Sequence, residues 1–333
     1  MSKIKIICTL GPKSYIPKIL YNLKKENIDI FRINLSHTND EDIERTIKYL
    51  KRFKIKNICI DTEGAQIRTT NTSKKYFLKK GYNIIIGKEN KFSSDKKINL
   101  YPNFDFKKIS IKKKIYIGFN NLCLEVVKKD IKKNLLICKV LKSGLLESKK
   151  GVHINSNLKL TALTQKDIIA LKIAKKLKIK NFAISFVNNH KDLNQVREIV
   201  GKKANIISKI ETRNAIKDLK NIAKNSDALL IDRGDLSRYI PIESIPSAQE
   251  YIVKISKLMK TPTYVATNLL ETMIQTSTPS RAESHDIYST LKQGAQGLVL
   301  AAETAIGIDP VNCVRFLKKC IKNYKINNIK KYI

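Results

Sequence analysis

The sequence of 333 residues has no tryptophan, only 12 glycines, and just 29 acidic residues against 65 lysines and arginines. No apolar run approaches the roughly 20 residues needed to span a bilayer, and the N-terminal residues alternate lysine with isoleucine instead of forming the apolar core of a secretory signal. We therefore expect a soluble, cytoplasmic protein with no membrane partner. Hydrophobic residues make up 42% of the chain, which is ample for a core and excludes a disordered protein.

Cysteine pairs and histidine clusters of the kind that bind zinc are also lacking. The six cysteines form no Cys-x-x-Cys pair and several lie inside apolar, strand-like runs, so we expect buried, reduced thiols. The four histidines are scattered, and a structural or surface role is expected for each. The residues concerned are Cys8, Cys59, Cys123, Cys138, Cys313 and Cys320, with His37, His153, His190 and His285.

The formal net charge of +36 could mark a nucleic-acid-binding protein, because lysine and arginine neutralise phosphates. The lysines, however, occur along almost the entire chain, with no basic arm and no nucleic-acid-binding motif. Lysine, isoleucine and asparagine, with 55, 50 and 28 residues, all have A/T-rich codons, so a biased source genome would produce the same excess. A solvated basic surface is favoured and no nucleic-acid partner is expected, with DNA binding kept as an alternative.

Short β-branched apolar runs recur along the chain, each followed by a turn and an amphipathic stretch, as is typical of βα units around a parallel sheet. Eight strands are predicted: Ile4–Leu10, Asp29–Ile33, Asn57–Asp61, Asn181–Ser185, Asn205–Lys209, Asp227–Asp232, Pro262–Thr267 and Gly297–Ala301. Eight such units predict an α/β fold, the (β/α)8 or TIM barrel, in residues 1–69 and 159–325.

The interval between the third and fourth strands is more than a hundred residues long and breaks this rhythm. Alternating segments within it predict a small β-barrel-like domain inserted at 70–158: Tyr82–Ile86, Lys114–Ile117 and Leu135–Val140. After the eighth strand we expect one helix, Pro310–Asn323, and a basic tail at 326–333.

Charged side chains are concentrated at the predicted carboxyl ends of the strands, where barrels carry their chemistry. Glu211 and Asp235, on neighbouring strands, could share a hard cation that prefers oxygen ligands. Lys209, Arg32 and Arg68 would supply positive charge beside it, as phosphoryl transfer requires. The pattern therefore indicates a phosphorylated or multiply anionic substrate.

Each of these residues also has a purely structural interpretation. Lys209 could be a solvated surface charge, Glu211 could cap the helix that begins near Thr212, and Asp235 could stabilise a turn. The segment Ser277–Glu283 could be no more than a loop and N-cap before a helix. We favour a functional interpretation because neither packing nor solubility explains charge at several separate strand ends of one barrel face.

Ordered motifs along the whole barrel carry a family pattern: Lys5–Pro12, Phe31–His37, Asp61–Gly64, Lys149–Val152, Ser208–Glu211, Arg233–Leu236, Ala266–Met273, Arg281–Glu283 and Glu303–Ala305. In these motifs the chain resembles the pyruvate kinase family. The resemblance implies a barrel with an inserted lid domain. It also implies transfer of the phosphoryl group of phosphoenolpyruvate to ADP, giving pyruvate and ATP, the last step of glycolysis.

The resemblance further implies roles for individual residues. Glu211 and Asp235 would hold Mg²⁺ or Mn²⁺, Lys209 would stabilise the phosphoryl group in flight with Arg32, and Thr267 would face the enolate. The implied substrate-binding residues are Arg32, Lys209, Arg233, Gly234, Asp235 and Thr267. The implied nucleotide-binding residues are Asn34, Arg68 and Lys166, and the implied K⁺ ligands are Asn34, Ser36, Asp61 and Thr62.

The chain also departs from the family pattern. Asp232 stands where an alanine usually precedes Arg-Gly-Asp, and Ala301 stands where a serine hydroxyl is linked to proton delivery. Four further departures are Gln66 for a glutamate and Ala65 for a proline, in a segment that sets potassium dependence, Glu63 for a lysine, and Asn188 for an arginine. None removes a metal ligand or Lys209, so an active enzyme is the favoured prediction.

Besides DNA binding, two other functions remain open. A degenerate, non-catalytic or regulatory barrel is suggested by Asp232, by Ala301, and by the expected lack of the family's C-terminal domain, which carries allosteric sites and a subunit interface. Without that domain we expect no classical effector response, and any homo-oligomer would form through barrel surfaces. A metal-dependent lyase acting through enolpyruvate would instead release pyruvate without a nucleotide.

Overall fold

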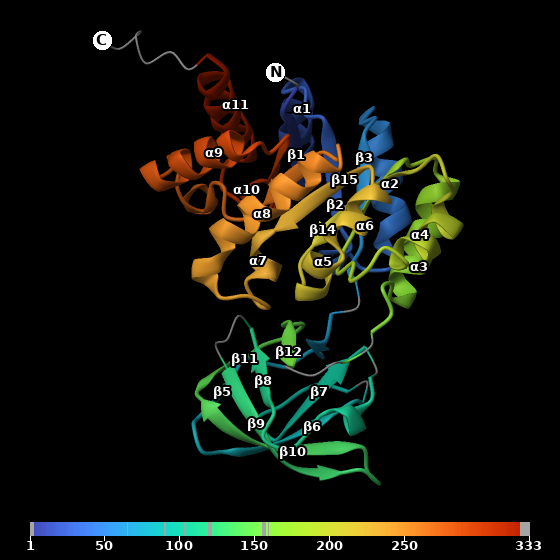
Figure 1. Ribbon diagram of the computed structural model, residues 1–333, viewed down its shortest axis with the longest axis vertical. Coiled ribbons are helices and arrows are strands. Elements are labelled where there is room, and N and C mark those ends of the chain that lie inside the picture. Colours follow the sequence, from blue (N-terminus) through green and yellow to red (C-terminus); the bar gives the residue numbers. More distant parts are fainter. Residues whose placement is uncertain are drawn as a thin grey trace. The chain divides into compact units, whose positions relative to one another are not determined.

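The barrel and the inserted segment form two separate units in the computed structural model (Figure 1). The first comprises Met1–Gly64 and Gln165–Ile333, and the second Ala65–Thr164. The structure describes residues 3–64, 66–89, 91–102, 104–118, 122–154, 158 and 160–326. Ala65 and the predicted tail beyond residue 326 lie outside the described residues.

Eight parallel strands close into a barrel in the first unit, which confirms the predicted (β/α)8 fold. Each strand begins and ends within one residue of its predicted bounds. The order around the barrel is β1 (Lys5–Leu10), β17 (Gly297–Leu300), β16 (Thr263–Ala266), β15 (Ala228–Asp232), β14 (Asn205–Ile210), β13 (Asn181–Ile184), β3 (Ile58–Asp61) and β2 (Ile30–Asn34). Strand β1 closes the ring because it pairs with both β2 and β17, with Lys5 opposite Gly297.

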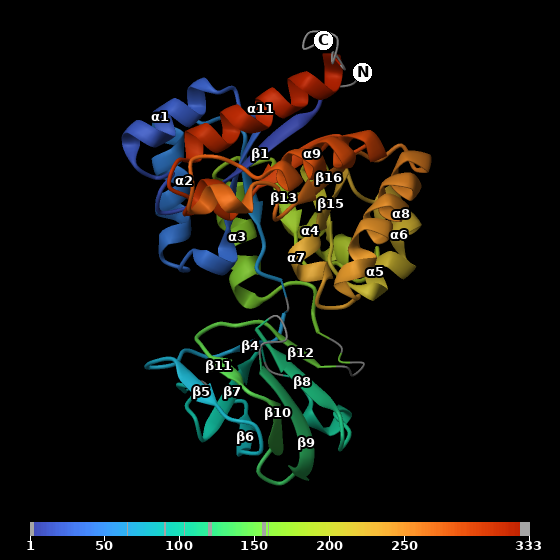
Figure 2. The same ribbon diagram turned by 90° about the vertical axis from the view of Figure 1, so that its left-hand side faces the viewer.

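The helices of the first unit lie outside the ring of strands (Figures 1 and 2). In α2 (Asp42–Arg52), Ile43, Ile47 and Leu50 recur at helical spacing and are fully buried, while acidic residues in the first turn and basic residues in the last suit the helix dipole. The other α-helices are α1 (Pro17–Lys25), α3 (Gln165–Lys176), α4 (Asp192–Val200), α5 (Arg213–Lys217), α6 (Leu219–Lys224), α7 (Arg233–Leu236), α8 (Ile245–Leu258), α9 (Arg281–Gln293), α10 (Ala302–Ala305) and α11 (Pro310–Ile326). Short 3₁₀ turns are η1 (Leu35–His37), η3 (Ile242–Ser244) and η4 (Glu271–Ile274).

Helix α9 begins at the N-cap that the sequence predicts. The Ser280 hydroxyl accepts a hydrogen bond from the Glu283 amide at 3.2 Å, and the Glu283 carboxylate accepts one from the Ser280 amide at 2.7 Å. Two backbone donors of the first turn are thereby satisfied. The predicted N-cap in this segment is confirmed.

Side chains from all eight strands fill the inside of the barrel: Ile7, Ile30, Cys59, Ala183, Ile207, Ala228, Leu230, Tyr264, Ala266 and Val299. Tyr264 is the largest of them and lies against Gly297 on the neighbouring strand. A Cβ atom at Gly297 would come within 2.5 Å of the Tyr264 ring. The barrel interior therefore needs a residue without a side chain at this position.

The inserted unit consists of a seven-stranded mixed sheet and a two-stranded sheet, which confirms the predicted β domain. In β10 (Leu135–Lys142), the buried Leu136, Cys138 and Val140 alternate with more exposed residues, so one face of the strand covers the core. The other strands of the large sheet are β12 (Val152–Ile154), β8 (Lys114–Ile117), β9 (Leu122–Asp130), β6 (Asn83–Gly87), β7 (Lys97–Tyr101) and β4 (Arg68–Thr69). The small sheet pairs β11 (Gly144–Leu146) with β5 (Tyr76–Leu78), and η2 (Phe106–Lys108) is a 3₁₀ turn.

All six cysteines are free thiols, and Cys320 is the partly exposed one. Burial raises the pKa of four of them to about 12: Cys8, Cys59, Cys138 and Cys313. The prediction of burial is confirmed for all of them but Cys320. Among the described residues, no helix combines the length and the apolar character that a membrane crossing needs.

Candidate active site

Polar side chains from five consecutive strands meet at the carboxyl end of the barrel. Strands β2, β3, β13, β14 and β15 end at or near Arg32, Asp61, Ser185, Lys209 and Asp232, respectively. Because parallel strands of a barrel end on one rim, residues far apart in the sequence become neighbours there. All five of these residues are buried.

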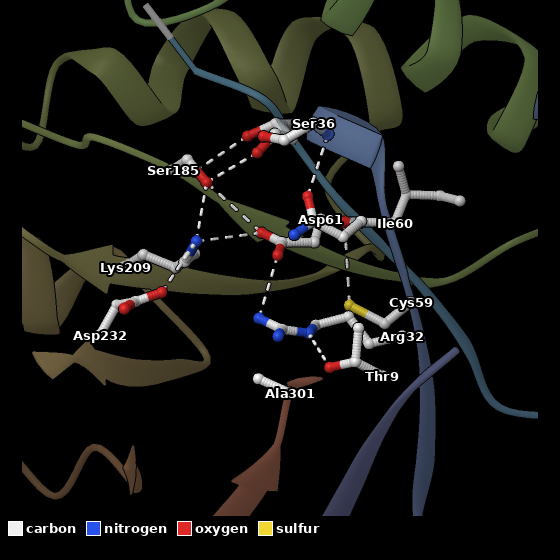
Figure 3. Close-up of polar contacts among 12 residues, drawn as sticks. Thr9, Arg32, Ser36, Cys59, Ile60, Asp61, Ser185, Lys209, Asp232 and Ala301 are labelled. Carbon is white, nitrogen blue, oxygen red and sulfur yellow. Dashed lines mark hydrogen bonds and ion pairs between the residues drawn. The ribbon is translucent and has the colours of Figure 1, made fainter. Parts of the chain in front are cut away.

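Lys209 is the centre of this group (Figure 3). Its Nζ lies 2.9 Å from Glu211 Oε1. It also lies 3.4 Å from Asp61 Oδ1 and 3.4 Å from Asp232 Oδ2. It also donates a hydrogen bond to Ser185 Oγ at 3.0 Å. With 5% of its surface exposed, Lys209 is not one of the solvated lysines of the surface.

The charged side chains of this group shift one another's pKa values. Burial alone would lower the pKa of Lys209, but Asp61, Glu211 and Asp232 outweigh it and hold that pKa well above its ordinary value. Burial alone would raise the pKa of Asp232, but Lys209 and Arg32 keep it below its ordinary value. Burial raises the pKa of Glu211 to about 8 against the opposing effect of Lys209. Lys209 therefore carries a positive charge, and the ionised form of Glu211 would be stabilised by a further cation.

Glu211 does not cap the following helix, because the Thr212 hydroxyl takes that role by accepting from the Ala215 amide. Glu211 Oε2 accepts from the Phe186 amide at 2.6 Å. Its Oε1 is buried and accepts no hydrogen bond, although it is ion-paired with Lys209. A buried carboxylate oxygen without a hydrogen bond is a suitable ligand for a hard cation.

The Glu211 carboxylate also has two acidic neighbours. One oxygen each of Glu211, Asp232 and Asp235 lie within 4.8 Å of one another. Asp235 is in α7 and its Oδ1 lies 3.1 Å from Arg238 Nε. Mg²⁺ and Mn²⁺ prefer oxygen ligands, so this donor set fits such an ion.

Arg32 links three strands of the barrel. Its Nη1 lies 3.0 Å from Asp61 Oδ2, and its Nε donates to Thr9 Oγ1 at 2.8 Å. Thr9 in turn donates to the Leu300 carbonyl at 2.8 Å, and Leu300 directly precedes Ala301. Arg32 is therefore held in a fixed orientation and is only 3% exposed.

The residues implied as K⁺ ligands supply oxygens at neighbouring strand ends. Asn34 Oδ1 accepts from the Ser36 amide at 3.0 Å, and Asp61 and Thr62 are both buried. The Thr62 carbonyl accepts from Ser185 Oγ at 2.7 Å. Neutral and charged oxygens thus lie beside the Lys209 group.

Arg233, Gly234 and Thr267 form a separate network at the same rim. Arg233 makes two bonds to Asp286, at 2.8 and 2.9 Å, and the Gly234 amide donates to Thr267 Oγ1 at 3.0 Å. Thr267 has a φ of +72°, in the left-handed region that β-branched residues rarely adopt. Backbone strain of this kind is concentrated at functional sites.

The structure does not bring all the sequence-predicted residues together within the barrel. Lys166 belongs to the barrel, where its Nζ donates to the Thr38 carbonyl at 2.6 Å and lies 3.4 Å from Asp40 and 3.6 Å from Glu63. Arg68 instead belongs to the inserted unit, where it donates to the Lys149 carbonyl at 3.2 Å.

Comparison with known proteins decides the family. A family model described as the pyruvate kinase barrel domain matches residues 1–314. The chain belongs to the pyruvate kinase family. It is 31% identical to the pyruvate kinase of Thermotoga maritima over 332 residues, covering 97% of this chain and 71% of that protein. It is also 31% identical to the enzyme of Agrobacterium vitis, covering 96% of this chain and 67% of that protein. It is 28% identical to pyruvate kinase isozyme G, chloroplastic, of Nicotiana tabacum, covering 95% of this chain and 58% of that protein.

The departures from the pyruvate kinase pattern fall in different surroundings. Glu63 forms an ion pair with Lys166, and Asn188 bridges the Phe186 carbonyl and the Thr212 hydroxyl, both at 3.0 Å. Gln66 is buried in the inserted unit, and its Oε1 has no hydrogen-bond partner. Asp232 alone among the departures contacts Lys209 directly in the part of the chain that the structure describes.

Two residues of the barrel were missed in the sequence analysis. Ser185 was included only as the end of the fourth predicted strand, yet it bonds both Lys209 and the Thr62 carbonyl. Asp167 is fully buried and accepts from the Glu63 and Gly64 amides at 2.7 and 3.0 Å, so it fixes the loop after β3. The only signal for Asp167 is an acidic residue in the first turn of α3, and this is equally typical of an exposed helix N-terminus.

Proposed function

We propose that this chain is a pyruvate kinase that transfers the phosphoryl group of phosphoenolpyruvate to ADP, giving pyruvate and ATP in the cytoplasm. The observation that carries the proposal is the buried, permanently charged Lys209 beside the carboxylates of Glu211 and Asp235 at the mouth of a barrel of this family. A fixed cation next to a divalent metal site is the arrangement that stabilises a phosphoryl group in transfer.

In the proposed reaction the bond between phosphorus and the enol oxygen breaks, and a bond to an oxygen of the ADP β-phosphate forms. Lys209 and Arg32 would hold the oxygens of the moving group, since both side chains are fixed by buried carboxylates. The enolate left behind would take a proton from the solvent at its methylene carbon, on the side where Thr267 would lie. Arg233 and Gly234 would orient the substrate carboxylate.

The ions and the nucleotide complete the proposal. Glu211 and Asp235 would hold Mg²⁺ or Mn²⁺, which when bound neutralises the charge of the substrate carboxylate and phosphate. Asn34, Ser36, Asp61 and the Thr62 carbonyl would hold K⁺. The proposed nucleotide-binding residues are Asn34, Arg68 and Lys166.

The test is pyruvate formation by the purified protein with phosphoenolpyruvate, ADP and Mg²⁺, with and without K⁺. We expect turnover, and we expect Lys209→Ala to lower kcat by about 10²- to 10³-fold, as loss of one preorganised charge does. Lys203→Ala, an exposed lysine just before the other end of β14, should leave kcat unchanged.

Other outcomes would assign the barrel differently. Pyruvate released without ADP would favour a lyase acting through enolpyruvate. A folded protein that forms no pyruvate under any of these conditions would favour the non-catalytic barrel that Asp232 and Ala301 suggest.

A further inference from the structure

The proposed reaction gives no task to a buried carboxylate that contacts Lys209 at the barrel mouth. Asp232 ends β15, is 6% exposed, and stands where the family pattern has an alanine. We infer that Asp232 is a third carboxylate ligand of the divalent cation, so that this chain binds the cation firmly before any substrate arrives. The inference rests on the proposed metal site of Glu211 and Asp235 and adds a residue to it.

The geometry of the three carboxylates supports a shared ion. One oxygen from each of Glu211, Asp232 and Asp235 lies within 4.8 Å of the others. Around a Mg²⁺ ion with metal–oxygen distances of about 2.1 Å, ligand oxygens are about 3 to 4 Å apart, so small rotations of these side chains suffice. Glu211 adds an indication from its surroundings, because its fully buried Oε1 has the ion pair with Lys209 at 2.9 Å but accepts no hydrogen bond.

The net charge of the buried side chains at the barrel mouth also favours a bound cation. The group contains three cations and four carboxylates, which leaves one net negative charge when all are ionised: Arg32, Lys209 and Arg238 against Asp61, Glu211, Asp232 and Asp235. Without Asp232 the same group would be neutral. An excess of buried negative charge is costly unless it is paired or binds a metal, so Asp232 raises the affinity of the mouth for a cation.

The contacts that Asp232 makes in the structure are long enough for its carboxylate to bind a metal ion instead. Its Oδ2 lies 3.4 Å from Lys209 Nζ, at the long end of an ion pair, and its Oδ1 accepts from the Asp235 amide at 3.3 Å. If Asp232 turns toward a cation, Lys209 keeps Asp61 at 3.4 Å and Ser185 at 3.0 Å. The carboxylate of Asp232 can therefore bind a metal without leaving Lys209 unpaired.

Binding of Mn²⁺ to the whole protein, without phosphoenolpyruvate or ADP, tests the inference. Free Mn²⁺ is followed by its electron paramagnetic resonance signal. Asp232→Asn, which keeps an acceptor for the Asp235 amide, should raise the Kd for Mn²⁺ at least about tenfold, since even outer-shell changes cost 10- to 100-fold. Asp227→Asn removes the same charge at the other end of β15 and should leave the Kd unchanged. An unchanged Kd in Asp232→Asn would overturn the inference.

Two further variants separate this inference from the proposed function. Glu211→Gln should weaken Mn²⁺ binding more than Asp232→Asn does, and if it has no effect, the proposed metal site itself is wrong. In a Lys209→Met background, a ligand role predicts that Asp232→Asn still weakens Mn²⁺ binding. If its effect disappears there, Asp232 acts only through Lys209 and is not a ligand. Thermal unfolding midpoints close to that of the unmodified protein establish that each variant is folded.

Discussion

At the scale of single residues, the barrel mouth depends on buried side chains that orient other side chains. Ser185 is 2% exposed and connects two strand ends, because its hydroxyl accepts from Lys209 Nζ and donates to the Thr62 carbonyl. A neutral partner of this kind directs the ammonium group without adding charge. The three carboxylates around Lys209 set its protonation, and Ser185 helps to set its position.

We expect Ser185→Ala to lower kcat by about tenfold, with a smaller change in KM. The reason is that Lys209 would lose a directional hydrogen bond, and hydrogen bonds to charged groups contribute about 1.5 to 3 kcal/mol. The measurement is steady-state pyruvate formation with phosphoenolpyruvate varied at saturating ADP and Mg²⁺.

Ser208→Ala is the matched control for Ser185→Ala. Ser208 is a buried serine of β14 whose hydroxyl bonds Ser226 at 2.7 Å and not Lys209. It should cost stability but leave kcat unchanged. If both variants lose the same activity, Ser185 has only a structural role.

At the scale of helices and strands, the sequence predicted the barrel because each strand is a short apolar run between polar turns. Runs such as Ala228–Asp232 are buried on both faces, so composition alone indicates them. The loops after the strands were not predictable in the same way. Thr267 and Phe186 have φ values of +72° and +52°, and no local preference of threonine or phenylalanine favours that conformation.

Contacts with elements far away in the sequence stabilise the positive φ values of Thr267 and Phe186. The Phe186 amide donates to Glu211, and Thr267 Oγ1 accepts from the Gly234 amide. The candidate metal-binding carboxylates and Lys209 were predictable from strand ends and from the family resemblance. Their partner Ser185 was not, since a serine at a strand end has no distinguishing pattern until the barrel closes.

The N-cap of α9 gives a prediction at this scale. Glu283 accepts hydrogen bonds from Thr272 and from the Ser280 amide, which hold its pKa below the ordinary value although burial alone would raise it. A carboxylate with a lowered pKa stabilises the folded state above its unfolded pKa of 4.5, and this stabilisation is lost as the pH falls through the folded pKa. We expect Glu283→Gln to lower the free energy of unfolding by about 1 kcal/mol at pH 7.

Urea unfolding between pH 7 and pH 3 checks this prediction. The difference between Glu283→Gln and the unmodified protein should shrink below pH 4.5. Glu198→Gln, an exposed position on α4, should show little difference at any pH. A Glu283→Gln difference that stays constant over this range would mean that the charge of Glu283 is not what stabilises the cap.

At the scale of the whole molecule, the charge of +36 and the division into two units are separate features. The cations of the candidate site, such as Arg32 and Lys209, are buried and matched by carboxylates. Many others are exposed, as in the pair of Lys48 with Glu44, and contribute little to stability. The net charge therefore describes the solvated surface more than the chemistry of the mouth.

The division into units predicts local effects of core mutations. Leu124 is fully buried in the core of the inserted unit, and Leu124→Ala should cost about 2 to 5 kcal/mol there. Hydrogen exchange followed by mass spectrometry should show faster exchange in β8, β9 and β10, with the barrel strands unchanged.

Leu229→Ala, at a fully buried position of β15, should give the reciprocal pattern. If either variant accelerates exchange equally in both units, the two cores unfold together, and the division by contacts does not describe how the protein opens.

The pairing of β1 with β17 also fixes an order of events during synthesis on the ribosome. Thr9 bonds the Leu300 carbonyl across 291 positions of the chain, so the barrel cannot close until that residue has been made. The inserted unit needs only residues up to Thr164. At the roughly 5 to 20 residues per second of translation, the interval between Thr164 and Leu300 lasts about 7 to 27 seconds. During that time the inserted unit can be complete, while the edge of β1 that later pairs with β17 stays open and needs protection from aggregation.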